Sequence, residues 1–165
     1  MAARPAKGEA VFVKVQDDDD SAAGGTSGGG YHRPPIRILL VDDNDDFRRQ
    51  AARFLAAEPG CNVVAFAASG DEAVELAKRI GPDLVLMDVS MPGINGFEAA
   101  RRIKALAGAP RVVIVTLDGG VPYRTASELA LADGFLSKAD FIREIRPLLE
   151  QLFPSSSGES EAEAT

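Results

Sequence analysis

Five short apolar runs, separated by stretches with helical patterning, constrain the fold of this chain more than any other feature. The runs begin after Pro35 and read IRILLV, NVVAFAA, DLVLMD, RVVIVTL and GFLSK. Most are apolar at consecutive rather than alternate positions, which is typical of parallel strands covered on both faces. Strands that alternate with helices in this way indicate repeated βα units. The sequence therefore predicts an α/β fold with a doubly wound, five-stranded parallel sheet.

Caps and apolar periodicity predict five helices between and after these strands. Ser69 and Glu72 have the spacing of a capping box, and Pro122 stands where a first helical turn tolerates proline. Pro147 lies inside the last helix and predicts a kink or a restart, because proline removes one backbone hydrogen bond. The expected helices are Asn44 to Ala57, Ser69 to Ile80, Gly96 to Leu106, Val121 to Leu131, and one that starts at Asp140.

The length of 165 residues fits one globular domain with tails. Residues 1–34 contain four adjacent aspartates and the run SAAGGTSGGG, a composition that buries too little apolar surface to fold, so we expect a disordered arm. Residues 35–153 form the predicted domain. Residues 154–165 are acidic and serine-rich, and we expect a disordered tail.

Composition excludes several classes of protein. The single cysteine, Cys61, rules out an intramolecular disulfide framework. No run approaches the length of about 18 apolar residues that a membrane span needs, and we expect a soluble, cytoplasmic protein without a membrane partner. The net charge of −7 gives no support for direct binding to nucleic acid.

Polar side chains follow four of the five predicted strands. Asp42 and Asp43 end the first, Asp88 the third, Thr116 the fourth and Lys138 the fifth. A single aspartate or threonine at such a place often only caps the next helix. Taken together these residues need another explanation, because one cap needs only one aspartate, and a lysine before a helix opposes the helix dipole. Ligands of open α/β sheets bind at these strand ends.

Three carboxylates at one edge of a sheet require a counter-charge. Two carboxylates about 4 Å apart repel each other by roughly 4 kcal/mol at an effective dielectric constant near 20. A hard divalent cation relieves this repulsion, and Mg²⁺ suits a site with few protein ligands because it keeps several waters. A carboxylate nucleophile, Mg²⁺, a hydroxyl group and a lysine around one point are the groups that phosphoryl transfer to aspartate requires.

Four motifs carry a specific resemblance. VDDNDDFR, LVLMDVSMPGINGFE, VIVTL and ADGFLSKAD occur in this order. In order and spacing they resemble the receiver domains of two-component response regulators, from Ile36 to about Leu152. The resemblance implies a flavodoxin-like strand order of 2-1-3-4-5 with five helices. The residues around these motifs are most similar to those of receivers that precede a helix-turn-helix output domain. Only a short segment follows Leu152, however, so we expect a stand-alone, single-domain response regulator.

The resemblance also implies roles around the metal. Asp88 would be the phosphoryl acceptor, and Asp42 with Asp43 would be the acidic pair that holds Mg²⁺ together with Asp88. The backbone carbonyl of Ser90 would be a further metal ligand. The donor would be a histidine kinase or a histidine phosphotransfer protein.

Three further roles concern the response to phosphorylation. The family pattern implies that Thr116 hydrogen-bonds the phosphoryl group, that Lys138 pairs with it, and that Phe135 is an aromatic switch. Output would pass through a downstream effector protein. The family often has proline after the lysine, joined by a cis bond; here Ala139 follows, and we expect a trans bond, because a cis bond before a non-proline residue costs about 2.5 to 4 kcal/mol.

Two other functions stay open at this stage. A receiver-like domain can serve as a scaffold that is never phosphorylated, although all of its key positions are filled here. Phosphatases with an aspartate nucleophile on a similar sheet carry a second aspartate two residues after the first, where this chain has Ser90. We therefore expect a phospho-acceptor rather than an enzyme that acts on other substrates.

Overall fold

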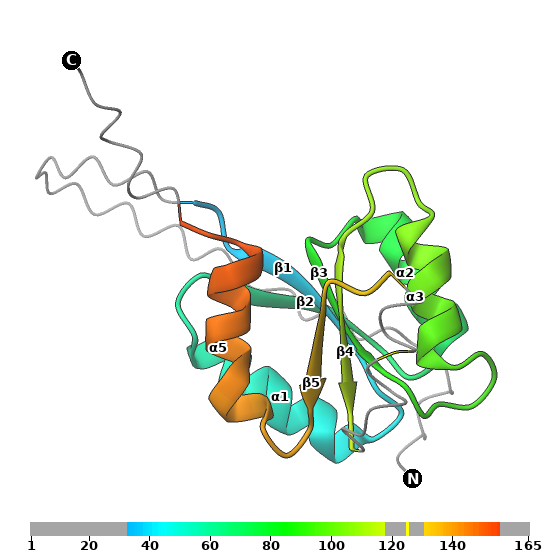
Figure 1. The fold of residues 1–165 in the computed structure, drawn as a ribbon, viewed down its shortest axis with the longest axis horizontal. Coiled ribbons are helices and arrows are strands. Elements are labelled where there is room, and N and C mark those ends of the chain that lie inside the picture. The colour runs from blue at the N-terminus through cyan, green and yellow to red at the C-terminus, as the bar shows by residue number, and fades with distance from the viewer. Residues whose placement is uncertain (1–32, 118–124, 126–130, 156–165) are drawn as a thin grey trace, which may run out of the picture.

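The fold alternates strands and helices along the chain. The computed structural model describes residues 33–117, 125 and 131–155 (Figure 1). Their elements, in chain order, are β1 (Ile36–Val41), α1 (Asp45–Ala57), β2 (Cys61–Ala67), α2 (Gly70–Ile80), β3 (Leu84–Asp88), α3 (Gly96–Lys104), β4 (Arg111–Thr116), β5 (Gly134–Ser137) and α5 (Phe141–Leu152).

The five strands form one parallel sheet in the order β2-β1-β3-β4-β5, which confirms the predicted fold class and strand order. The register places Asp88 beside Val115, and Thr116 beside Ser137. Because all strands run in the same direction, their carboxyl ends meet at one edge of the sheet. That edge is where a doubly wound fold binds its ligands.

Helices cover both faces of the sheet, α1 and α5 on one and α2 and α3 on the other (Figure 1). Successive residues of β1 alternate between the two cores. Leu39 and Val41 pack on the side of α2 and α3, whereas Ile38 and Leu40 pack on the side of α1 and α5. All four are at most 1% exposed. This burial on both faces explains why the strands are apolar at consecutive positions.

Side chains at the start of three helices fix where those helices begin. Asn44, Ser69 and Asn95 each accept a hydrogen bond from a backbone N–H three residues further along the chain. Glu72 reaches back as a capping-box residue, although its carboxylate accepts from the N–H of Ala68 rather than from that of the cap residue Ser69. The predicted starts of α1 and α2 are therefore confirmed to within one residue.

The last helix, α5, begins directly after Asp140, as the sequence predicted. Helix α5 runs through Pro147 without a restart. Asp140 precedes the helix, but its side chain makes no capping hydrogen bond; its carboxylate accepts instead from the Ser137 hydroxyl, at 2.8 Å. The N–H of Asp140 in turn donates to Ser137 Oγ.

Some predictions concern residues that the structure does not describe. The helix predicted from Val121 to Leu131 falls almost wholly outside the described residues and stays a prediction, so four of the five predicted helices are seen. The proposed disordered arm (1–34) and tail (154–165) likewise stay predictions. None of the helices in the described ranges is long and apolar enough to cross a membrane.

Candidate functional site

The acidic pair begins where β1 ends. Asp42 is 1% exposed, and its N–H continues the strand pairing by donating to Ala67 O of β2, at 3.0 Å. Its Oδ1 accepts the N–H of Asn44, at 2.9 Å, which orients the carboxylate. Asp43, the next residue, is exposed. One carboxylate of the pair is thus fixed inside the sheet edge, while the other faces solvent.

Asp88 is the last residue of β3 and is 4% exposed. The start of α3 packs directly against its main chain: the N–H of Gly96 donates to Val89 O, at 3.0 Å. A Cβ atom at Gly96 would overlap the carbonyl oxygen of Asp88 and lie 2.8 Å from its carbonyl carbon. Only glycine therefore permits α3 to approach the end of β3 this closely.

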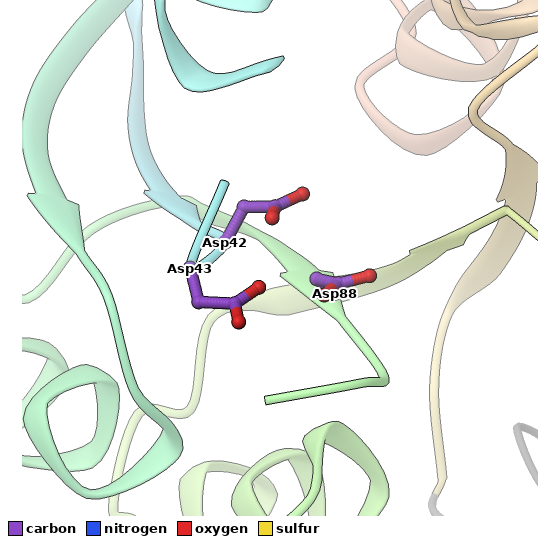
Figure 2. Close-up of side chains that lie close together, drawn as sticks. All are labelled: Asp42, Asp43 and Asp88. Carbon is purple, nitrogen blue, oxygen red and sulfur yellow. The ribbon is translucent and has the colours of Figure 1, made fainter. Parts of the chain in front are cut away.

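The three carboxylates gather at the same edge of the sheet (Figure 2). One carboxylate oxygen each from Asp42, Asp43 and Asp88 lies within 4.8 Å of the others. This confirms the convergence that was predicted from their places at the ends of β1 and β3.

Lys138 brings a cation to these carboxylates from the end of β5. Its Nζ atom lies 2.5 Å from Asp42 Oδ2 and 3.4 Å from Asp88 Oδ1, and its side chain is 9% exposed. Its N–H donates to Thr116 O, at 2.7 Å, which anchors it to the end of β4. The Lys138–Ala139 peptide bond is trans, as expected.

Burial and like charges make ionisation of Asp88 costly. Desolvation and the neighbouring Asp42 carboxylate raise the pKa of Asp88 to about 6, despite the opposing effect of Lys138, and Asp43 adds to the rise. A carboxyl group whose pKa is raised by burial and by specific neighbours, at the ligand-binding edge of a sheet, is a candidate for function.

A divalent cation fits these residues. Asp42 Oδ2 is buried, and its partner in the part of the chain that the structure describes is the Lys138 ammonium, with Nζ 2.5 Å away. A metal at this oxygen would share the Asp42 carboxylate with the Lys138 ammonium, whereas the carboxylate of Asp43 is exposed. Three carboxylates and one lysine leave an excess of negative charge, and an all-oxygen donor set of this kind suits Mg²⁺.

The remaining predicted residues lie around this cluster. Thr116 ends β4 and is 3% exposed, whereas Ser90 is exposed in the loop after β3. Phe135 is half-buried and packs against the core on the side of α2 and α3. Leu117, which follows Thr116, is 81% exposed. The structure thus brings Asp42, Asp43, Asp88 and Lys138 together and places Thr116 at the same edge.

The sequence analysis missed two neighbours of the site on α1. Arg48 donates to Asp42 O, at 2.8 Å, and forms an ion pair with Asp45, so it ties the first turn of α1 to the end of β1. The ring of Phe47 lies beneath Lys138 Nζ, 4.6 Å from its centroid to the nitrogen. The spacing of Asp45 and Arg48 could have indicated an ion pair; Phe47 gave no signal beyond an apolar helix face.

Known proteins share this fold and its sequence pattern. Over 106 residues the chain is 38% identical to the response regulator GacA of Pseudomonas aeruginosa, an alignment that covers 64% of this chain and 50% of GacA. A two-component response regulator of the LuxR family from Aurantimonas is similar in structure, with a TM-score of 0.64 and 35% identity over 71% of this chain and 86% of that one.

The signal receiver domain of the putative response regulator NarL from Mycobacterium tuberculosis gives a TM-score of 0.69 at 28% identity, covering 74% of this chain and all of that one. The chain spans half or less of the length of the curated relatives that it matches. Residues 38–150 match the family of response regulator receiver domains. This chain therefore belongs to the response regulator receiver domain family.

Proposed function

We propose that this protein is a phosphorylation-dependent signalling switch. In this proposal Asp88 accepts a phosphoryl group from a histidine kinase or a histidine phosphotransfer protein, with the aid of Mg²⁺. The observation that carries the proposal is the placement of a buried carboxylate, 4% exposed, among two further carboxylates and a lysine at the ligand-binding edge of a receiver fold.

Each group in the cluster has a chemical task in this proposal. Asp88 is the nucleophile: one of its carboxylate oxygens forms the new bond to phosphorus while the bond from phosphorus to the donor histidine breaks. Asp42 and Asp43, with Asp88 and the Ser90 carbonyl, would hold the cation, which when bound would neutralise charge on the transferring phosphoryl group.

Lys138 and Thr116 act after transfer in this scheme. The ammonium of Lys138 is already 3.4 Å from Asp88 Oδ1, so a phosphoryl group on that residue meets a cation at the position where its charge appears. Thr116, at the end of the neighbouring strand β4, supplies a hydroxyl group. Phe135 would change its packing as these groups move.

The added phosphoryl group carries about −1.5 to −2 charges and three acceptor oxygens, and this changes the surface that the domain presents. We propose that the output is a contact with a downstream effector protein in the cytoplasm, without direct binding to nucleic acid or membrane. The protein would not act on other substrates, although it would contribute to its own phosphorylation and dephosphorylation.

Phosphorylation of the purified protein tests this proposal. With Mg²⁺ and acetyl phosphate, wild type should gain one alkali-labile phosphoryl group by intact-protein mass spectrometry, and Asp88→Asn should gain none. Asp46→Asn is a matched control, because Asp46 is an exposed aspartate in the first turn of α1, outside the acidic cluster. Labelling that persists in Asp88→Asn would place the acceptor elsewhere.

A further inference from the structure

An aromatic ring forms one side of the Lys138 position. Nζ of Lys138 lies 4.6 Å from the centroid of the ring of Phe47, a residue in the first turn of helix α1. The N–H of Phe47 donates to the side chain of Asn44, at 3.0 Å, so the first turn of α1 is fixed at this residue. The ring also packs edge-to-face on Phe141 of α5, with centroids 5.5 Å apart and planes at 76°.

The surroundings of Lys138 make this ring contact significant. The face of an aromatic ring carries partial negative charge and attracts an ammonium group within about 6 Å, more strongly where water is excluded. The Lys138 side chain is only 9% exposed. The ammonium thus has a ring as one neighbour and two carboxylates, those of Asp42 and Asp88, as the others.

Lysine and metal would use the same oxygen atom. Asp42 Oδ1 accepts the N–H of Asn44, whereas Oδ2 faces the Lys138 ammonium, with Nζ 2.5 Å away. A cation that binds through Oδ2 therefore meets the ammonium already there. Any contact that stabilises Lys138 in this position, and is weakened when Lys138 moves, opposes binding of the metal.

We propose that Phe47 is a positioning residue, which holds the ammonium of Lys138 beside Asp42 in the metal-free protein and so weakens Mg²⁺ binding. The proposal relies on the proposed function only for the identity of the metal. The ring keeps a cation in the acidic cluster while Mg²⁺ is scarce. When the metal binds, Lys138 is released toward Asp88, the group it would pair with after phosphoryl transfer.

Measuring the affinity for Mg²⁺ tests the claim that Phe47 weakens metal binding. Phe47→Leu keeps an apolar side chain but removes the ring, and it should bind Mg²⁺ about two- to tenfold more tightly than wild type in isothermal titration calorimetry. Phe47→Tyr keeps an aromatic face and should restore the wild-type affinity. Phe54→Leu is the control, because Phe54 is another half-buried phenylalanine of α1 that packs in the same core.

The position of the ammonium can be measured without metal. In NMR spectra of the metal-free protein, the Cε protons of Lys138 should be shifted upfield by the Phe47 ring in wild type and in Phe47→Tyr. That shift should disappear in Phe47→Leu and remain in Phe54→Leu. A Lys138 resonance without a ring shift in wild type would overturn the positioning contact, whatever the protein does with Mg²⁺.

The proposed role of Phe47 and the proposed phosphorylation of Asp88 can be contradicted independently of each other. A folded Phe47→Leu protein whose Mg²⁺ affinity equals or falls below that of wild type overturns the role of Phe47, while phosphorylation of Asp88 stays intact. If Phe47→Leu does not fold, pentafluorophenylalanine placed at position 47 keeps the shape of the ring but reverses the charge of its face, and the same gain in affinity is expected. An unchanged affinity in that variant overturns the proposal equally.

Discussion

At the scale of single residues, the site holds several carboxylates where burial disfavours their charged form. Asp42 and Asp88 are almost fully buried, and the pKa of Asp88 rises to about 6 through burial first and the Asp42 charge second. Lys138 offsets only part of this effect. The metal-free domain is therefore under electrostatic strain at neutral pH, and removing charge there should stabilise it.

The pH dependence of stability follows from this shift. The folded-state pKa of Asp88 is about 6, above the ordinary value of 3.8, so between these values the folded protein binds the additional proton. The Asp88 contribution to the free energy of unfolding is greatest below about pH 4, falls as pH rises to about 6, and is constant above that. In metal-free urea denaturation at pH 7, Asp88→Asn should be more stable than wild type by on the order of 1 to 3 kcal/mol.

Comparing wild type with Asp88→Asn near pH 4 provides the control. Both folded proteins then carry a neutral side chain at position 88, so the difference between their free energies of unfolding should shrink. Lower stability of Asp88→Asn at pH 7 would show that the Asp88 charge is satisfied in the folded state, contrary to the origin assigned to its pKa.

Asp43 allows metal binding to be separated from folding. It is exposed, so Asp43→Asn should leave the melting temperature of the metal-free protein within a few degrees of that of wild type. Saturating Mg²⁺ should raise the melting temperature of wild type according to RT ln(1 + [L]/Kd), and should do so much less for Asp43→Asn. A wild-type melting temperature that Mg²⁺ does not change would contradict the proposed metal site.

At the scale of elements, the close approach of α3 to the end of β3 is the feature on which the position of Asp88 depends most. Gly96→Ala forces a Cβ atom against the carbonyl group of Asp88, so either α3 or the strand end must move. We expect a loss of at least about 1 to 3 kcal/mol in stability, as for overpacking elsewhere. Mg²⁺ should also bind more weakly, because the main chain that carries Asp88 shifts.

Gly108→Ala separates this clash from ordinary backbone strain. Gly108 has a φ of +65°, and a Cβ atom added there would meet nothing within 4 Å, so alanine costs only the strain of a left-handed conformation, about 1 to 2 kcal/mol. That variant should lose stability but keep the Mg²⁺ affinity of wild type in calorimetry. Equal effects of both variants on Mg²⁺ affinity would show that the α3 contact does not position Asp88.

At the scale of the whole molecule, the question is how an event at Asp88 reaches a distant surface. Lys138 connects the cluster to β5 and to the start of α5, and its N–H is bound to Thr116 at the end of β4. These two residues are the candidates for contacts that differ between the two states, and only such contacts shift a conformational equilibrium. Neither is the nucleophile.

Mutation of these residues should separate phosphorylation from propagation. Thr116→Ala and Lys138→Ala should still accept a phosphoryl group, more slowly, because Asp88 and the acidic pair remain. In NMR, phosphorylated wild type should show changes in backbone amide shifts over residues 121–141, whereas the phosphorylated variants should change mainly near Asp88. If both variants show the full remote pattern, the coupling runs through other residues.

The sequence alone determined the fold class, the strand order implied by the family motifs and the set of acidic residues at the site. It could do so because these features are periodic or local. Strands buried on both faces need apolar residues at consecutive positions, and parallel strands bring their last residues to one edge. Knowing that Asp42 and Asp43 follow the first strand and that Asp88 ends the third was enough to predict that they meet.

The tertiary structure decided which atoms touch and at what electrostatic cost. The pairing of Lys138 with Asp42 Oδ2 and the Phe47 ring beside it join residues that are far apart in sequence, and the start of α3 folds back so that Gly96 contacts Asp88. Their distances depend on how the helices pack on the sheet, which no local pattern encodes. The pKa of Asp88 depends on the same packing, because desolvation and neighbouring charges exist only once the whole domain has folded.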